Sequence, residues 1–483
     1  MLGWLRRNIL QPQKDRTAGR PSRIVRAKYD SAMTSDHNRR HWAHADGLSV
    51  NAANSVEVRR ILRNRSRYEV ANNSYARGIT LTLANDVVGT GPRLQMLTAD
   101  GEANRRIEHE FHRWAKAVNL AEKLRTLRMA QVQDGEAFAI LISNPTLPTA
   151  IQLDLRLIEA DQVATPFRGW NDPRETDGII FDAAGNPFEY YVLRQHPGEN
   201  AIGWESDRVP ATSVVHLFRA DRPGQRRGIP EITSALPLFA MLREYSLATL
   251  DAAKAAAYYA GIIYTDAPPS GEADSIEPLD PIELERNTLL TMPGGWRMSQ
   301  LQAEQPTGTF ADFKREILNE IARCLNMPFN VAAGNSSSYN YASGRLDHQT
   351  YFKSLRIDQS RMELVVLDRI LAAWLDEAVL VGDLLPVDQG PFMNWPHQWF
   401  WDGHEHVDPA KEANAQATRL ASHTTTLADE YARRGQDWET QLRQRAKEIA
   451  LMQELGLSPV SSTSQPVPEL ANDELSEDPV AAE

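Results

Sequence analysis

The chain has 483 residues, with 52 Lys and Arg against 64 Asp and Glu, which gives a net charge of −12. Its 42% hydrophobic and 24% charged residues exclude a wholly disordered or fibrous protein. The net negative charge argues against a tight, non-specific duplex binder, because such binding needs a cationic surface. The single cysteine, Cys324, excludes an internal disulfide and a cysteine-based metal site, and it fits a reducing compartment.

Targeting and membrane signals are absent from the sequence pattern. Met1 to Arg7 is short, apolar and then basic, and it lacks the apolar core of a secretory signal. No uncharged apolar stretch approaches the roughly 18 residues that a membrane-spanning helix needs. We therefore expect a soluble protein made in the cytoplasm, with no membrane partner.

Charge is concentrated in three segments. Residues 1–24 form a basic arm, and residues 458–483 carry six acids and no Lys or Arg, which is typical of a disordered acidic tail. Residues 260–307 hold eight acids against two bases. This segment predicts a separate acidic surface, although a plain solvated loop region stays open. Its main acids are Asp266, Glu272, Asp274, Glu277, Asp280, Glu283 and Glu285.

The first 220 residues predict a mixed α+β region. Apolar spacing indicates one helix over 55–88, which ends at a Gly-Thr-Gly-Pro cluster, and a second over 101–120. Five arginines between 59 and 67 are typical of a solvated or intersubunit face. Apolar runs and alternation predict strands at 137–142, 151–158 and 214–218 and a hairpin at 179–181 and 188–193.

The middle of the chain predicts two helices around the acidic segment. Residues 231–259 are rich in Ala and Leu, and residues 309–325 place apolar side chains at helical spacing. Strands and loops are expected between them. Cys324 lies at the end of the second helix as a core or interface residue.

A polar segment at Asn330 to Gly344 follows, glycine-bounded and free of Lys, Arg, Asp and Glu. It predicts a mobile loop that can hydrogen-bond or stack without strong attraction. Arg345 to Val381 then predicts a long helix with two apolar stripes, buried on more than one side. An aromatic strand is expected at Asn394 to Trp401, and helices over 408–457 with a break near Gly435.

Catalytic motifs are largely missing. The sequence has no phosphate-binding Gly-x-x-x-x-Gly-Lys-Ser/Thr loop, no Gly-x-Ser-x-Gly elbow and no His-Glu-x-x-His pair. The glycine pair at Gly89 and Gly91 lacks the rest of a dinucleotide fingerprint. We therefore expect no enzyme, no catalytic residues, no metal site and no cofactor.

One constellation leaves an alternative open. His397, Asp402, His404, Glu405 and His406 are metal-ligating residue types, and His404 and His406 would share one face of a strand. Nothing fixes a third ligand for them. With the acids of the middle segment, they keep open a metal-dependent DNA-processing enzyme.

The order of these features resembles the lambda-like family of tailed-bacteriophage portal proteins. Several short motifs, spread over roughly residues 25–455, carry the resemblance. They are Asn72-Asn73-Ser74-Tyr75-Ala76-Arg77, Val87-Val88-Gly89-Thr90-Gly91-Pro92-Arg93-Leu94-Gln95, Gln133-Asp134-Gly135-Glu136, Ile158-Glu159-Ala160-Asp161-Gln162, Arg227-Gly228-Ile229-Pro230 and Ser337-Ser338-Tyr339-Asn340-Tyr341-Ala342-Ser343-Gly344-Arg345.

The resemblance implies an α+β portal-type fold in a ring of about twelve copies at one capsid vertex, with a channel for double-stranded DNA. The parts it implies follow in chain order. They are a basic arm (1–24), a wing (25–230), a stem helix (231–259), a clip (260–307), a second stem helix (308–326), a tunnel loop (327–344), a long helix with the rest of the wing (345–407), a helical crown (408–457) and an acidic tail (458–483).

The resemblance also implies residue roles and partners. The acids of 260–307 named above would dock the terminase large subunit and later a head–tail connector. The major capsid or scaffold protein would be a further partner. The protein would reside in the virion. A portal of a defective prophage or gene-transfer particle, and an oligomeric scaffold that never meets DNA, stay open. The residues expected to face DNA are Asn335, Ser336, Ser337, Ser338, Tyr339, Asn340, Tyr341 and Arg345.

Overall fold

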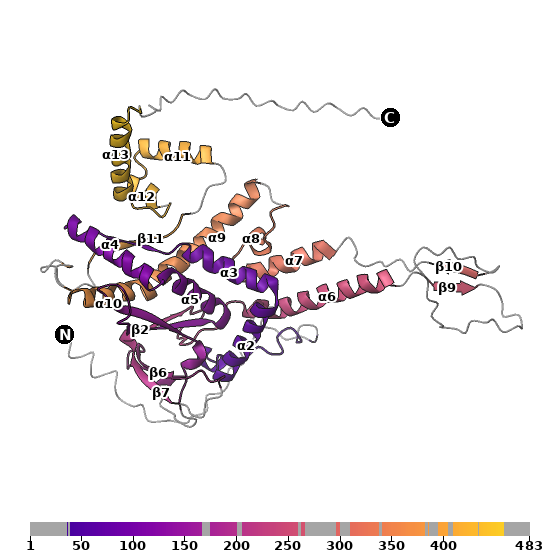
Figure 1. Cartoon of the computed structure of the whole chain (residues 1–483). Coiled ribbons are helices and arrows are strands. Elements are labelled where there is room, and N and C mark those ends of the chain that lie inside the picture. The colour runs from indigo at the N-terminus through magenta and orange to yellow at the C-terminus, as the bar shows by residue number, and fades with distance from the viewer. Residues whose placement is uncertain are drawn as a thin grey trace, which may run out of the picture.

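The computed structural model describes most of the chain, in segments separated by gaps (Figure 1). The described residues are 36, 39–166, 174–199, 205–258, 262–265, 296–299, 310–337, 341–381, 385, 395–403, 409–432 and 434–457.

Residues up to 235 form the mixed α+β region that the sequence predicts. Its helices are α1 (Val50–Ala53), α2 (Val56–Asn72), α3 (Ser74–Val88), α4 (Gly101–Ala117) and α5 (Leu120–Asp134), with short 3₁₀ turns η2 (Ala160–Gln162), η3 (Ala211–Ser213) and η4 (Thr233–Ala235). Its strands are β1 (Arg93–Met96), β2 (Glu136–Ser143), β3 (Leu153–Ile158), β4 (Glu175–Thr176), β5 (Ile179–Phe181), β6 (Pro187–Leu193), β7 (Ser206–Pro210) and β8 (Val214–Phe218).

The prediction of a single helix over 55–88 is wrong. The segment forms two helices, α2 and α3, which meet at Asn73. This residue has an extended backbone (φ −120°) and closes α2. Its side-chain oxygen accepts hydrogen bonds from the backbone N–H groups of Tyr75 and Ala76 and so caps α3. An asparagine side chain competes with helical backbone bonds in this way, which explains the break.

Two antiparallel sheets follow, of which the three-stranded one packs on α5 and the four-stranded one packs against the three-stranded sheet. One has the order β3-β2-β8, and the other has the order β4-β5-β6-β7, which contains the expected hairpin β5–β6. The large core between sheet and helices includes Phe111, Trp114 and Trp374, and a smaller one includes Phe138 and Tyr190.

Helices α6 (Leu236–Tyr258) and α7 (Phe310–Arg323) lie side by side and project from the body (Figure 1). The ring of Tyr245 on α6 lies 5.5 Å from that of Phe310 and 4.9 Å from that of Phe313. Beyond them β9 (Ile262–Thr265) and β10 (Trp296–Ser299) pair antiparallel. The chain therefore leaves the body along α6 and returns along α7.

The next helices differ from expectation at their start. A short helix, α8 (Phe329–Ala333), lies within the expected loop, and α9 (Tyr341–Met362) begins four residues before Arg345. A π-helical stretch, η5 (Glu363–Leu367), then leads into α10 (Asp368–Ala378). The widened turn of η5 buries both Val366 and Leu367.

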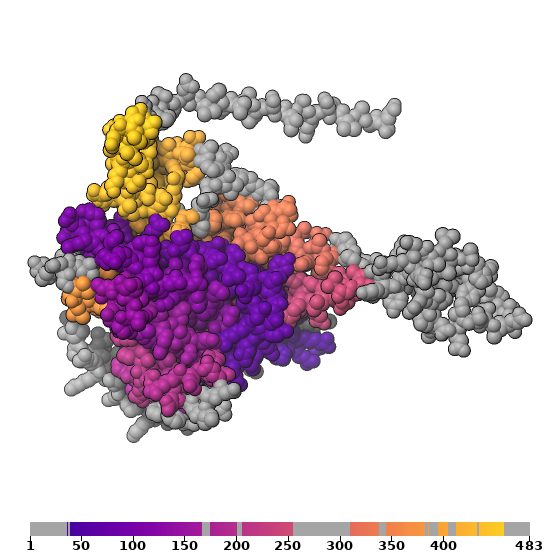
Figure 2. Space-filling view, viewed as in Figure 1, coloured from indigo at the N-terminus to yellow at the C-terminus, as the bar shows by residue number. Residues whose placement is uncertain are grey.

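The C-terminal part includes the expected aromatic strand, β11 (His397–Phe400), which pairs with β1. Helices α11 (Pro409–Ala421), α12 (Leu427–Ala432) and α13 (Trp438–Glu454) follow, and Figure 2 shows them standing above the main body. Gly435 (φ 65°) marks the expected break. Within the described part of the chain, no helix has the length and apolar character needed to cross a bilayer.

Candidate functional site

The polar segment between α8 and α9 is shorter than expected and begins at a glycine cap. Gly334 adopts a left-handed conformation (φ 63°) that ends α8. Asn335, Ser336 and Ser337 are exposed, and the Ser337 backbone N–H donates to Asn335 Oδ1 over 2.9 Å. Ser338, Tyr339 and Asn340 lie outside the described residues, and Tyr341 is the first residue of α9.

One hydrogen bond ties the two ends of this segment together. Asn330 on α8 lies with its amide nitrogen 3.0 Å from Nε2 of His348, in the second turn of α9. An amide nitrogen is a donor, so this His348 nitrogen accepts. Arg345, one turn earlier on α9, is exposed. The polar segment is therefore presented between two linked helices.

Helix α9 is fixed to α3 by two further hydrogen bonds. Tyr351 Oη donates to Asp86 Oδ2 over 2.7 Å, and Gln359 Nε2 donates to the Val87 carbonyl over 3.0 Å. Burial and the neighbouring Asp86 carboxylate raise the pKa of Tyr351, so it stays protonated and keeps donating.

Arg128 on α5 joins the long helix to the chain just before α6. Its guanidinium lies 3.0 Å from Glu231 and 2.9 Å from Asp358 on α9. Burial opposes its charge, but these two carboxylates outweigh burial and raise the pKa of Arg128. Cys324, at the end of α7, is half-buried and donates from Sγ to the Glu231 carbonyl over 3.2 Å. Segments on both sides of the projecting helices therefore meet at Glu231.

The arginine run on α2 is not the solvated face that its composition indicates. Arg59 and Arg63 are buried and Arg67 is half-buried, since residues four apart lie on one helix face. Arg60 and Arg65 are exposed. The inward members form ion pairs with acids distant in sequence: Arg59 with Asp177, Arg63 with Glu136 and Asp161, and Arg67 with Asp134, Glu159 and Asp161.

Two of the resemblance motifs meet at the centre of this network. Arg227 Nη2 lies 2.7 Å from Glu136 Oε1, and His216 Nε2 lies 3.2 Å from Glu136 Oε2. Burial alone would raise the pKa of Glu136, but Arg227 and His216 hold it well below its ordinary value. A Cβ on Gly228 would collide with the Gly135 carbonyl, so this close approach requires glycine. The contact itself could not be predicted from the sequence.

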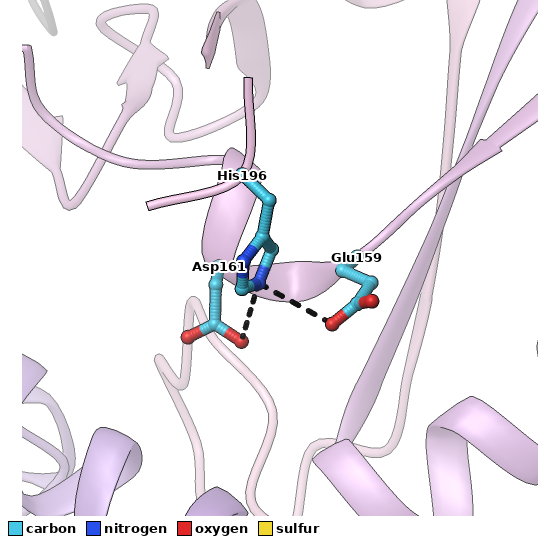
Figure 3. A group of neighbouring side chains, drawn as sticks. All are labelled: Glu159, Asp161 and His196. Carbon is cyan, nitrogen blue, oxygen red and sulfur yellow. Dashed lines mark ion pairs between the residues drawn. The ribbon is translucent and has the colours of Figure 1, made fainter. Parts of the chain in front are cut away.

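A cluster that the sequence did not reveal joins β3 to the end of β6 (Figure 3). His196 Nε2 lies 3.4 Å from Glu159 and 3.8 Å from Asp161. Arg67 binds the same two carboxylate oxygens, over 3.3 and 2.8 Å. Gly198 N–H donates to His196 Nδ1, so the hydrogen of a neutral ring lies on Nε2, facing the acids. A hydrogen on Nε2 and the binding of Arg67 to both carboxylate oxygens disfavour metal ligation at this cluster.

The candidate metal constellation is divided in the structure. His397 contacts Asp368 through Nε2 over 3.2 Å and the Trp395 carbonyl through Nδ1 over 2.8 Å. Asp402 accepts a hydrogen bond from Thr90 Oγ1 over 2.8 Å. His404, Glu405 and His406 lie outside the described residues. The two described members are thus engaged with different partners.

The acids expected to form a docking surface fall in 266–295, outside the described residues. Strands β9 and β10, with Ile262 opposite Ser299 and Thr265 opposite Trp296, bracket that segment in the sequence. The role of these acids stays a prediction.

Comparison with known proteins gives consistent matches over most of the chain. A family model described as phage portal protein, lambda family, matches residues 37–359. The probable portal protein of Halomonas phage phiHAP-1 is 26% identical over 425 residues, covering 82% of this chain and 81% of that protein. Portal protein B of Escherichia phage lambda is 21% identical over 367 residues, covering 68% of each.

Solved structures that the chain resembles come from gene transfer agent particles. A chain from the neck of an empty particle has a TM-score of 0.47 at 16% identity, with 77% of this chain and 93% of that chain covered. A chain from a native virion has a TM-score of 0.44 at 16% identity, with 81% and 96% covered.

Proposed function

Because the chain belongs to the lambda family of phage portal proteins, we propose that about twelve copies form a ring at one capsid vertex. The ring is the channel through which double-stranded DNA enters the head and later leaves it. The family match over residues 37–359 carries this proposal. The paired helices α6 and α7 project from the body toward β9 and β10, and this arrangement supports assigning them as the stem (Figure 1).

The polar segment before α9 is proposed to face the DNA. Asn335, Ser336 and Ser337 are exposed and uncharged, so they can touch a duplex without gripping its phosphates. Ser338, Tyr339, Asn340 and Tyr341 complete this segment. The exposed guanidinium of Arg345 would add one weak phosphate contact per copy.

The acidic segment beyond β9 is proposed to dock the terminase large subunit during packaging and the head–tail connector afterwards. Its charge is distinct from that of the rest of the chain, with eight acids against two bases over 260–307. Such a surface favours a partner with a complementary cationic patch. The wing would contact the major capsid or scaffold protein, and the assembled ring would belong to the virion.

We propose a structural role for this chain, with ATP hydrolysis supplied by the terminase partner. The metal-dependent DNA-processing alternative relies on His397 and its neighbours, but His397 is bound to Asp368 and Asp402 is bound to Thr90. A DNA-cleavage assay with added Mg²⁺ or Mn²⁺ separates the two functions. Cleavage that is lost in a His404→Ala, His406→Ala variant would favour the enzyme.

The test of the portal function is the native mass of the purified full chain, with particle images of the same sample. We expect rings near twelve times the chain mass of 54.2 kDa, roughly 650 kDa, with a central hole. The same protein should enter heads assembled in the host. A chain that stays monomeric in solution and is absent from heads would overturn the proposal.

A further inference from the structure

One face of α9 is exposed and carries positive but no negative charge. At 100° per residue, its members fall within one side of the helix. Leu346 and Ile357 on this face are 67% and 55% exposed and lie among its charged side chains. The exposed residues of this face are Arg345, Leu346, Gln349, Thr350, Lys353, Arg356, Ile357 and Ser360.

The cations of this face have no acidic partner among the described residues of their own copy. Lys353 and Arg356 form no ion pair with any described residue. Asp347 and Asp358 point to the other sides of α9, and Asp358 is bound to Arg128. The face therefore combines exposed apolar area with charge that lacks a counterion, which is the composition of a protein interface rather than of a solvated surface.

Helix α7 presents acids on one side between Asp312 and Glu320, and this run ends at the exposed Arg323 on the same side. Asp312, Glu316 and Glu320 recur every four residues and are exposed, with the 49% exposed ring of Phe313 beside them. Arg315 is bound to Asp312 over 3.0 Å and lies 3.6 Å from Glu316. Glu320 forms no ion pair with a described residue. This face thus also has an acidic edge and an apolar edge.

The two faces match in charge, apolar content and length. Arg345 to Arg356 spans about 16 Å along α9, and Asp312 to Glu320 spans about 12 Å along α7. Within one copy α7 and α9 diverge from α8, and both faces are open to solvent (Figure 1). A second copy of this chain is therefore the occupant that fits each face.

We propose that α9 of one copy packs antiparallel to α7 of the next, with Lys353 paired to Glu320, Arg356 paired to Glu316, and Ile357 beside Phe313. The two faces differ, so the contact is heterologous and closes into a ring when repeated. This contact rests on the proposed ring and assigns residues to it. Arg345, at the end of the face nearest the polar segment, remains available to DNA.

The test uses a pair of charge-reversed full-length proteins. Variant A carries Lys353→Glu and Arg356→Glu, and variant B carries Glu316→Lys and Glu320→Lys. Each variant alone brings like charges together at every contact, which disfavours assembly by several kcal/mol. We expect each to lose the ring and run as a monomer in light scattering.

Mixing the two variants restores every contact. In an alternating ring, the acidic α9 face of A meets the basic α7 face of B, and the basic α9 face of B meets the acidic α7 face of A. An equimolar mixture should therefore recover the wild-type mass, and native mass spectrometry should find equal numbers of A and B. An alternating ring must contain an even number of copies.

A matched control is Arg113→Glu with Lys116→Glu on α4, which has the same spacing and the same change in net charge as variant A. This control should still form rings. All variants should keep the wild-type circular dichroism, because the substituted side chains are exposed and their loss leaves the fold of each copy intact.

The outcomes separate this contact from the ring itself. Intact rings in variants A and B, or a mixture that stays monomeric, would overturn the α9–α7 contact while the wild-type ring stands. A wild-type protein that forms no ring would instead overturn the proposed function on which the contact rests.

Discussion

Arg128 Nη1 lies 3.0 Å from Glu231 Oε2, and its Nη2 lies 2.9 Å from Asp358 Oδ2. One buried guanidinium on α5 therefore joins the segment that leads into α6 to the long helix α9. Gln131 adds a hydrogen bond of 3.1 Å to Glu231 and holds the same carboxylate.

Replacing Arg128 with Met should destabilise the protein strongly. The change keeps the aliphatic part of the side chain but removes the cation closest to the buried Glu231 carboxylate and leaves only Arg219, 3.8 Å away. Loss of one partner of a buried ion pair is typically worth roughly 3–5 kcal/mol. Urea unfolding of the purified protein measures it. Arg113→Met, which breaks the exposed pair with Glu110, is the control and should cost less than about 1 kcal/mol. An equal loss of unfolding free energy in the two variants would show that burial of the Arg128 ion pair does not add to its contribution to stability.

The ion pair between Glu136 and Arg227 should make the fold sensitive to acid. Arg227 and His216 outweigh burial and keep the pKa of Glu136 well below its unfolded value. Its stabilisation is therefore complete above about pH 4.5 and declines as pH falls toward the folded pKa, by up to about 1.4 kcal/mol per pH unit. Glu136→Gln should lower the melting temperature at pH 7 and flatten its decline below pH 4.5. Parallel pH curves for variant and wild type would contradict this assignment.

Sequence periodicity predicted elements whose buried face is apolar throughout. Helix α4 and the β5–β6 hairpin were predicted in this way and are confirmed. Helix α5 was missed, because its buried face includes Arg128, Gln131 and Asp134, which a hydrophobicity pattern counts as solvated. Polar residues reach the interior only when partners from distant segments neutralise them, and local spacing carries no information about those partners.

The arginine run on α2 shows the same limit. Spacing places Arg59, Arg63 and Arg67 on one face, but their acids lie 67 to 118 residues further along the chain. The polar composition of the segment before α9 was visible in the sequence. Helix α8, which makes this segment shorter than expected, was not, because the five residues Phe329–Ala333 are too few to show a helical spacing of apolar side chains. The roles of the DNA-facing and docking residues stay predictions.

Glu108 should make docking of the C-terminal helices depend on pH. The direction is opposite to that expected for Glu136, because docking should weaken as pH rises. Burial, together with Asp437 and Glu439, raises the pKa of Glu108 to about 7. Its neutral form is favoured in the fold, so its contribution is complete below about pH 4.5 and is lost as pH rises through 7. The slope should stay below about 1 kcal/mol per pH unit, because the side chain is only partly buried.

The measurement is hydrogen exchange of β1 and α13 between pH 5 and 8, corrected for intrinsic exchange. Wild-type protection of these elements should fall across the range, whereas Glu108→Gln should keep it nearly constant. Gln95→Ala serves as the comparison, since it removes the 2.7 Å bond to Asp437 without removing a titrating group. It should weaken protection equally at every pH. If protection of β1 and α13 in Glu108→Gln depends on pH as it does in the wild type, Glu108 is not the group that causes this dependence.

Replacing both Tyr339 and Tyr341 with Ala should leave the ring intact and impair DNA packaging or retention. The aromatic rings offer steric and stacking contacts to a passing duplex, and their loss widens the opening without changing its charge. Packaged genome length and DNA loss from filled heads are the readouts, and native mass verifies the ring. Phe188→Ala, which removes an exposed aromatic ring on β6, is the control and should package normally. Unchanged packaged length and retention in the Tyr339, Tyr341 variant would exclude the polar segment as the part of the channel that holds DNA.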